Sequence, residues 1–285
     1  MENNDFAVFI LTHARPDNVI TYHKLIGSGY TGKIYIIIDN EDKTADKYYK
    51  NFGDKVIMFD KKEIAKTFDE ADNFNDRRSI VYARNACFNI AKTLGIVYFI
   101  QLDDDFLKFD FRINGNGQRP SGHYRIRTKL NEVFYSLLKY YKTLNTKSLA
   151  MAQGGDFIGG LSNQFYDYKL RRKCMNTFIC STKRPFKFIG RINEDVNTYI
   201  REGSLGRLFL TTPLVSITQH ETQTNKGGMS DIYLDKGTYI KSFYSIIFNP
   251  SSVVVGLMGD KNMRLHHRVS WDNAVPVILN EKYKI

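Results

Sequence analysis

Three consecutive carboxylates, Asp103, Asp104 and Asp105, directly follow the apolar run of residues 96–102. Ionised carboxylates this close together repel one another unless a cation lies among them. Mg²⁺ and Mn²⁺ prefer oxygen ligands and leave coordination positions for water and phosphate oxygens. The alternative is an exposed acidic turn, but a buried strand directly before the acids favours a metal site.

Several arginines could neutralise phosphate groups, because a guanidinium group makes two-point contacts with phosphate oxygens. The candidates are Arg15, Arg84 and the pair Arg77 and Arg78. Arg84 stands out because its predicted helix leads directly into the acidic strand. Asp39 ends another apolar run and could accept hydrogen bonds from a ribose or a base, or could equally cap a helix or turn.

A second acidic pair, Glu194 and Asp195, follows the segment 190–193. A carboxylate in a cleft can deprotonate a hydroxyl as a general base, or it can cap a helix. By position alone the cap is the simpler interpretation.

The last third contains further candidates, each with a structural alternative. A lone histidine such as His220 is more often structural than catalytic. Lys226 with Gly227 and Gly228 could present backbone amides to phosphate or form a plain turn. His266, His267 and Trp271 could contact phosphate and stack on a ring, or pack the end of the chain.

The elements that would position these residues alternate between strand and helix. Short apolar runs indicate buried strands, each ending in polar residues, and alternation of this kind favours a parallel sheet that binds ligands at its carboxyl edge. We therefore predict an α/β fold with a mainly parallel central sheet. The expected strands are 7–11, 33–39, 55–59 and 96–102. One expected helix begins at a cap on Asp17, and two others span 43–52 and 79–94. Farther on we expect a turn at 114–117, a helix at 128–144, strands near 150, 175–180 and 208–212, and helices from 193–195 and over 236–248.

Charge is concentrated in the middle of the chain. The chain has 285 residues and a formal charge of +11, and residues 106–193 contain 17 Lys and Arg but only 4 Asp and Glu. Such a segment could bind a polyanion, although a solvated basic surface is the simpler alternative. We see no linker that would divide the chain, and we expect one domain over 1–285.

The sequence predicts a protein without a membrane segment in a reducing compartment. The longest apolar runs, such as 253–258, are far shorter than the roughly 20 residues of a membrane helix. Cys87, Cys174 and Cys180 form no pattern typical of disulfides or zinc. We expect a cytoplasmic location.

The strand followed by Thr12 and Arg15, together with Asp39, Arg84 and the acids 103–105, resembles the donor half of GT-A glycosyltransferases and their D-x-D motif over residues 6–110. The acidic pair 194–195 resembles the region in which inverting members keep their base. The stretch from 219 through His266, His267 and Trp271 resembles the TET-associated glycosyltransferases, a branch linked to phage and other DNA-modification systems.

This resemblance implies a GT-A-like fold with a donor nucleotide-binding half at 1–105 and an irregular acceptor-binding half at 106–285. It also implies a metal-dependent transfer of sugar from a nucleotide-diphosphate sugar, such as a UDP-sugar, to hydroxymethylated pyrimidines in DNA. Nucleotide contacts would come from Thr12, Arg15, Asp39, Arg84, Asp103 and Asp104, with Lys226, Gly227 and Gly228. Mn²⁺ or Mg²⁺ would be held by Asp105 and Asp103, with His220 as a further ligand. Asp195 would be the base and Glu194 the less favoured choice.

Other functions remain open at this point. The acceptor could be a protein or a glycan. A sugar nucleotidyltransferase usually needs a glycine-rich loop after the first strand, and residues 12–16 contain no glycine. A non-catalytic nucleic-acid-binding protein would use the basic segment alone.

Overall fold

The computed structural model describes residues 5–112, 123–157, 174, 176–219, 237, 239–258, 263–276, 278 and 281. Four parallel strands form the amino-terminal part of a nine-stranded sheet, in the order β3-β2-β1-β4. These strands are β1 (Phe6–Leu11), β2 (Lys33–Asp39), β3 (Val56–Phe59) and β4 (Tyr98–Asp103). The intervening helices are α1 (Ile20–Gly27), α2 (Ala45–Phe52), α3 (Lys61–Ala65) and α4 (Val81–Thr93), with a 3-10 turn, η1 (Gly53–Lys55), before β3.

Beyond β4 the sheet becomes mixed, in the order β8-β7-β9-β5-β6. The strand β8 (Thr177–Ser181) is antiparallel to β4, and β7 (Ser148–Ala152) is parallel to β9 (Phe209–Gln219). The far edge is formed by β5 (Phe106–Phe111) and β6 (Tyr124–Arg125), which are antiparallel. A 3-10 turn, η2 (Gly154–Phe157), follows β7. The predicted α/β class is confirmed, with parallel pairing among β1, β2, β3 and β4.

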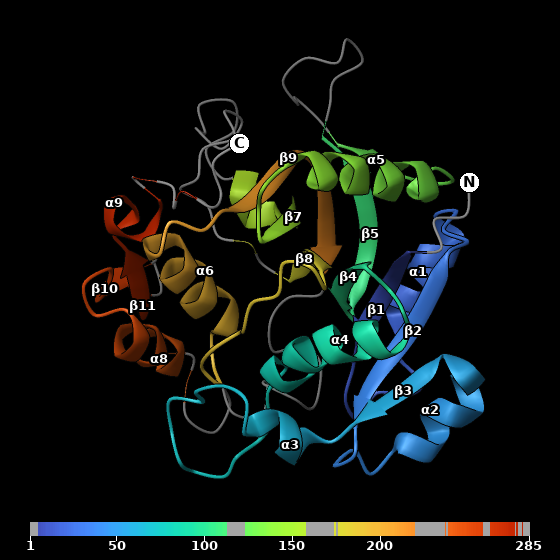
Figure 1. Ribbon diagram of the computed structural model, residues 1–285, viewed down its shortest axis with the longest axis horizontal. Coiled ribbons are helices and arrows are strands. Elements are labelled where there is room, and N and C mark those ends of the chain that lie inside the picture. Colours follow the sequence, from blue (N-terminus) through green and yellow to red (C-terminus); the bar gives the residue numbers. More distant parts are fainter. Residues whose placement is uncertain are drawn as a thin grey trace.

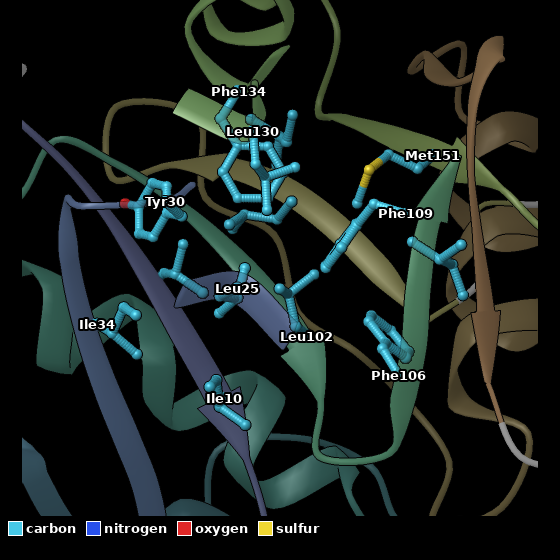
Figure 2. Close-up of a cluster of buried hydrophobic side chains, with 14 of the residues drawn as sticks. Ile10, Leu25, Tyr30, Ile34, Leu102, Phe106, Phe109, Leu130, Phe134 and Met151 are labelled. Atoms are coloured by element: carbon cyan, nitrogen blue, oxygen red, sulfur yellow. The ribbon is translucent and has the colours of Figure 1, made fainter. Parts of the chain in front are cut away.

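The sheet is curved, and this curvature determines where the acids between β4 and β5 lie. Only two residues, Asp104 and Asp105, separate β4 from β5 along the chain. In the sheet, however, three strands lie between β4 and β5. The far edge must therefore bend back towards the tip of β4. Figure 2 shows Phe106 and Phe109 of β5 facing Leu102 of β4 in the core beneath this bend. The backbone amide of Thr21 donates to the carbonyl of Asp104 at 3.0 Å, so α1 is joined to the turn.

Hydrophobic cores cover both faces of the sheet. Alternate side chains of β1 point to opposite faces, as the pleat requires, so Val8 and Ile10 join one core while Phe9 and Leu11 join the other. The first core includes α5 (Leu130–Thr143), which lies across the top of the sheet in Figure 1. The second includes α4 and α6 (Glu194–Ser204).

The carboxyl-terminal part adds α8 (Ile240–Phe248), α9 (Trp271–Ala274) and a separate antiparallel pair, β10 (Val253–Met258) and β11 (Arg264–Val269). Figure 1 shows these elements beside α6. All three cysteines are buried free thiols. Among the described residues, no helix is both long and apolar enough to cross a bilayer.

Some predicted details are wrong. α1 begins at Ile20 without a side-chain cap, and Asp17 instead accepts a hydrogen bond from Asn51, so the predicted Asp17 cap is not formed. Strand β5 and the pair β10 and β11 were not predicted, and β9 extends to Gln219. The predicted turn at 114–117 lies outside the described residues.

Candidate active site

The three acids at the end of β4 have different surroundings. Asp103 is the last residue of the strand, and Asp104 and Asp105 form the turn into β5. Asp104 is buried, whereas Asp103 and Asp105 are half-buried. The three side chains therefore cannot share one role.

Asp104 fixes the loop that follows β1. Its Oδ2 accepts a hydrogen bond from the Thr12 hydroxyl at 2.7 Å, and its Oδ1 lies 3.1 Å from Nη1 of Arg15. The Thr12 hydroxyl also lies 2.9 Å from that of Tyr48. Burial raises the pKa of Asp104, and the charge of Arg15 opposes that shift. Thr12 and Asp104, expected to contact nucleotide, are thus directed towards each other, and Arg15 completes the cluster.

Replacing Thr12 by valine is expected to lower the free energy of unfolding by about 1–3 kcal/mol, because Asp104 would keep its buried oxygen without this donor. Urea denaturation measures the change. The exposed Thr93, which donates only to a carbonyl of its own helix, is the matched control. If Thr12→Val and Thr93→Val unfold at the same urea concentration, the hydroxyl contributes nothing to the loop.

A buried arginine joins the two acidic motifs. The Arg84 side chain is 1% exposed. Its Nη2 donates to Oδ1 of Asp103 at 3.2 Å and its Nε donates to Oε1 of Glu194 at 2.9 Å. The guanidinium carbon lies 4.9 Å from the centre of the Phe178 ring. Arg84, expected to contact nucleotide, therefore lies beneath the surface and connects the tip of β4 with the start of α6.

Negative charge exceeds positive charge around Arg84. Burial raises the pKa of Asp103 to about 7; the charge of Arg84 opposes this shift, while Asp105 and Glu194 add to it. Burial also raises the pKa of Glu194, again against Arg84. An added cation would stabilise the ionised form of both carboxylates.

The carboxylates of Asp103 and Asp105 suit a hard divalent cation that takes most of its ligands from phosphate oxygens and water. Asp103 and Asp105 flank the turn and supply carboxylate oxygens. In the described ranges, no group of three His, Cys, Asp or Glu side chains could hold a metal ion. Phosphate oxygens and water would have to complete the coordination, as is usual for Mg²⁺ beside a bound phosphate. The excess negative charge fits such an ion.

Asp195 lies at the second position of α6, next to Glu194. It is half-buried, and its Oδ1 accepts a hydrogen bond from the backbone amide of Val196 at 2.8 Å. The helix start places partial positive charge beside this carboxylate. Glu194 is engaged by Arg84, so Asp195 is the acid of the pair that no buried arginine holds.

Asp39 ends β2 and is held by the side chains of His13 and Lys61. Its Oδ2 lies 2.8 Å from Nδ1 of His13 and 3.3 Å from the Lys61 ammonium group. Burial alone would raise the pKa of Asp39, but the His13 hydrogen bond and the Lys61 charge outweigh it and hold the pKa below its usual value. His13, which the sequence analysis did not single out, is the more exposed member of this cluster.

The other arginine candidates are paired with acids. Arg77 lies 2.7 Å from Glu41, and Arg78 lies 2.8 Å from Asp76. These contacts hold the segment before α4 and place neither guanidinium against Asp103.

Arg191 is a further site residue that sequence reasoning missed. Its side chain is 1% exposed, lies 2.8 Å from Asp72 and donates to the Tyr244 hydroxyl at 2.9 Å. It thereby fixes the segment just before Glu194 against α8. Gly190 beside it has φ +80, and a Cβ there would lie 2.4 Å from Nδ2 of Asn197. The glycine directly before an arginine was the available signal.

The remaining candidates lie away from this site or outside the described residues. Trp271 packs its ring against Tyr199 at 5.9 Å between centroids, and His267 is buried in β11 next to His266, so the structural alternative holds for Trp271 and His267. His220, Lys226, Gly227 and Gly228 lie outside the described residues.

Comparison with known proteins gives one family match and several similar solved structures. The model of the TET-associated glycosyltransferase family matches residues 6–228. No curated protein is similar enough in sequence to count as a relative. One similar solved structure is glucosyl-3-phosphoglycerate synthase from Mycobacterium tuberculosis, in complex with Mn²⁺, uridine diphosphate and phosphoglyceric acid: it is 10% identical with a TM-score of 0.44, over 96% of this chain and 90% of that one. Another is TarS 1-349 from S. aureus, 10% identical with a TM-score of 0.42, over 86% of this chain and 66% of that one. The family match covers most of the chain, including both acidic motifs, and the chain therefore belongs to the TET-associated glycosyltransferase family.

Proposed function

We propose that this glycosyltransferase moves a sugar from a nucleotide-diphosphate sugar, such as a UDP-sugar, to the hydroxyl group of a hydroxymethylated pyrimidine in DNA, with Mn²⁺ or Mg²⁺ bound. One observation carries the chemistry: Arg84 joins Asp103, at the end of β4, to Glu194, at the start of α6. Acids from two distant parts of the sequence thus meet at one place, as a reaction with separate donor and acceptor groups requires.

Donor binding is assigned to the end of β4 and the neighbouring loops. Asp103 and Asp105 would hold the cation, which stabilises the charge on a departing diphosphate. Asp39, held by His13 and Lys61, would accept hydrogen bonds from the nucleoside. The Arg15 side chain is 20% exposed, and its guanidinium group, which also contacts Asp104, would bind phosphate. Lys226 with Gly227 and Gly228 would add phosphate contacts, and His220 would add a metal ligand.

Acceptor activation is assigned to Asp195. The acceptor hydroxyl attacks the anomeric carbon as the bond from that carbon to the diphosphate oxygen breaks, and the bonding electrons leave with the diphosphate. The hydroxyl proton passes to the Asp195 carboxylate, which must lie within hydrogen-bond reach of it. Attack from the side opposite the leaving group would invert the anomeric centre. Glu194 is the less suitable base because Arg84 holds it.

Replacing Asp195 by asparagine is expected to lower kcat about a hundredfold while donor affinity stays unchanged, because an amide cannot accept the proton. Single-turnover transfer and calorimetry with the nucleotide measure the two quantities. Asp46→Asn, at an exposed position on α2, is the matched control. If Glu194→Gln abolishes transfer and Asp195→Asn does not, Glu194 is the base and Asp195 is not.

The family and the basic segment 106–193 support a DNA acceptor. Labelled nucleotide sugars, incubated with hydroxymethylated DNA, unmodified DNA and protein, test this choice. We expect label only in the hydroxymethylated DNA. Incorporation into protein alone would overturn the DNA acceptor, and DNA binding without any use of a nucleotide sugar would overturn the enzymatic proposal.

We place the reaction in the cytoplasm. The buried free thiols Cys87, Cys174 and Cys180 agree with a reducing compartment. Fractionation of producing cells tests the location.

A further inference from the structure

We propose that a strip of basic side chains at the edge of the sheet opposite the acids binds the phosphodiester backbone of the DNA, away from the base being modified. The basic strip consists of Lys92, Lys139, Lys142, Lys183, Arg184 and Lys187. The identity of the partner rests on the proposed function; the existence of the surface does not.

The strip lies where β4 begins, whereas the acids lie where it ends. β8 runs antiparallel to β4, and Ser181 at its end pairs with Tyr98 at the start of β4. The segment carrying Lys183 therefore leaves the sheet at that edge. Five strand steps from Tyr98 to Asp103 span about 17 Å. Figure 1 shows the same separation, with α5 at the top of the view and the arrowhead of β2 at the bottom.

Aromatic rings fix two of the cations in place. The Arg184 guanidinium carbon lies 3.9 Å from the centre of the Tyr141 ring, and Nη2 of Arg184 donates to the Tyr141 carbonyl at 3.1 Å. The Lys142 ammonium group lies 4.5 Å from the centre of the Tyr98 ring. The two rings are themselves in edge contact, with centroids 6.3 Å apart. The two cations therefore sit on adjoining supports, and less side-chain freedom is lost when an anion binds.

The strip continues from this pair towards α4. Asn85 of α4 and Phe188 hold each other through two hydrogen bonds of 2.9 Å, so the segment after β8 is fixed on the helix. Lys187 and Lys92 face each other closely enough that burial, and then the charge of Lys92, lower the pKa of Lys187. Like charges held together are costly unless an anion offsets them.

Acids do not neutralise the strip. Within the described ranges, none of its six side chains forms an ion pair with a carboxylate. On α5, the exposed ring of Tyr135 lies one turn before Lys139 and two turns before Lys142, on the same helix face. Unpaired cations spaced along a surface with an exposed ring suit a phosphodiester chain, whose binding draws its free energy from released counterions. The proposed acceptor is such a chain, and a long one can reach this edge.

The test uses the full chain with Lys142→Gln, Lys183→Gln and Lys187→Gln combined. Lys24→Gln, Lys47→Gln and Lys50→Gln, on α1 and α2, form a control with the same change in charge. Binding of unmodified duplex DNA of about 30 base pairs is measured across salt concentrations, without a nucleotide sugar present. For the strip variant only, we expect about tenfold weaker binding. We also expect the slope of log K against log salt concentration to fall by about 2–3 for this variant. Transfer to a hydroxymethylated dinucleotide, which cannot reach the strip, should be unchanged.

Two results would overturn the proposal: equal DNA affinity and salt slope in the strip and control variants, or loss of binding to phosphatidylserine-containing vesicles in the strip variant while DNA binding stays at the parental level. The second result would assign the surface to an anionic membrane. If the parent binds DNA through the strip but transfers no sugar to hydroxymethylated DNA, the proposed function fails and the strip assignment stands.

Discussion

Asp105→Asn is expected to lower the rate of sugar transfer about a thousandfold, the upper range seen when one group that stabilises transition-state charge is removed. Asparagine has nearly the same shape as aspartate but carries no charge, so it is a poor ligand for Mn²⁺ or Mg²⁺. Because Asp105 lies in a half-buried turn, the fold should survive the change. Initial rates with a nucleotide sugar and hydroxymethylated DNA measure the effect.

Two comparisons separate loss of the metal ligand from loss of structure. The thermal unfolding temperature of Asp105→Asn should stay close to that of the parent, and Asp46→Asn should keep the parental rate. Transfer at the parental rate by Asp105→Asn would show that this carboxylate does not hold the cation.

Arg84→Met is expected to lower the free energy of unfolding by about 3 kcal/mol, because methionine fills much of the space but leaves the carboxylates of Asp103 and Glu194 without their buried counter-charge. Urea denaturation measures the loss. The surface pair of Arg77 with Glu41 supplies the control: Arg77→Met should cost less than about 1 kcal/mol.

The double variant Arg84→Met with Glu194→Gln identifies the cause. If the cost comes from unpaired charge, neutralising Glu194 should recover part of it, and the two changes should be non-additive. Additive losses would mean that Arg84 stabilises the protein through its packing on Phe178 and not through the acids.

The strands β1 to β4 could be predicted because each is a short apolar run bounded by polar residues. The observed limits of β1 to β4 lie within two residues of the predicted ones. β5 escaped prediction because its pattern is irregular: Asp110 is buried within it and Lys108 is half-buried, so neither strict alternation nor a continuous apolar run is present. The α1 cap failed because two residues, Asn18 and Val19, separate Asp17 from the helix.

The site was predictable in its residue types but not in its connections. A strand ending in acids placed Asp103 to Asp105 at a sheet edge from sequence alone. The contact of Arg84 with Glu194 spans 110 positions and depends on how α6 docks beside α4. The same holds for Thr12 and Asp104, which are predictable as loop residues yet bond to each other only because β1 and β4 are neighbours.

The position of the basic segment 106–193 on the folded protein could likewise not be predicted from the sequence. Its excess of positive charge is evident from composition, but composition cannot say which edge of the sheet receives it. The antiparallel pairing of β8 with β4 carries Lys183, Arg184 and Lys187 to the edge away from the acids. A single basic face around the reaction centre therefore does not describe these three residues.

The most direct test of the central claim is calorimetric titration of Mn²⁺ into the protein in the presence of uridine diphosphate. The acids at the end of β4 should take up one ion per chain, and Asp105→Asn should abolish the heat of binding. No heat with the parental chain, or the same heat with the variant, would contradict the assignment of these carboxylates to the metal and the diphosphate.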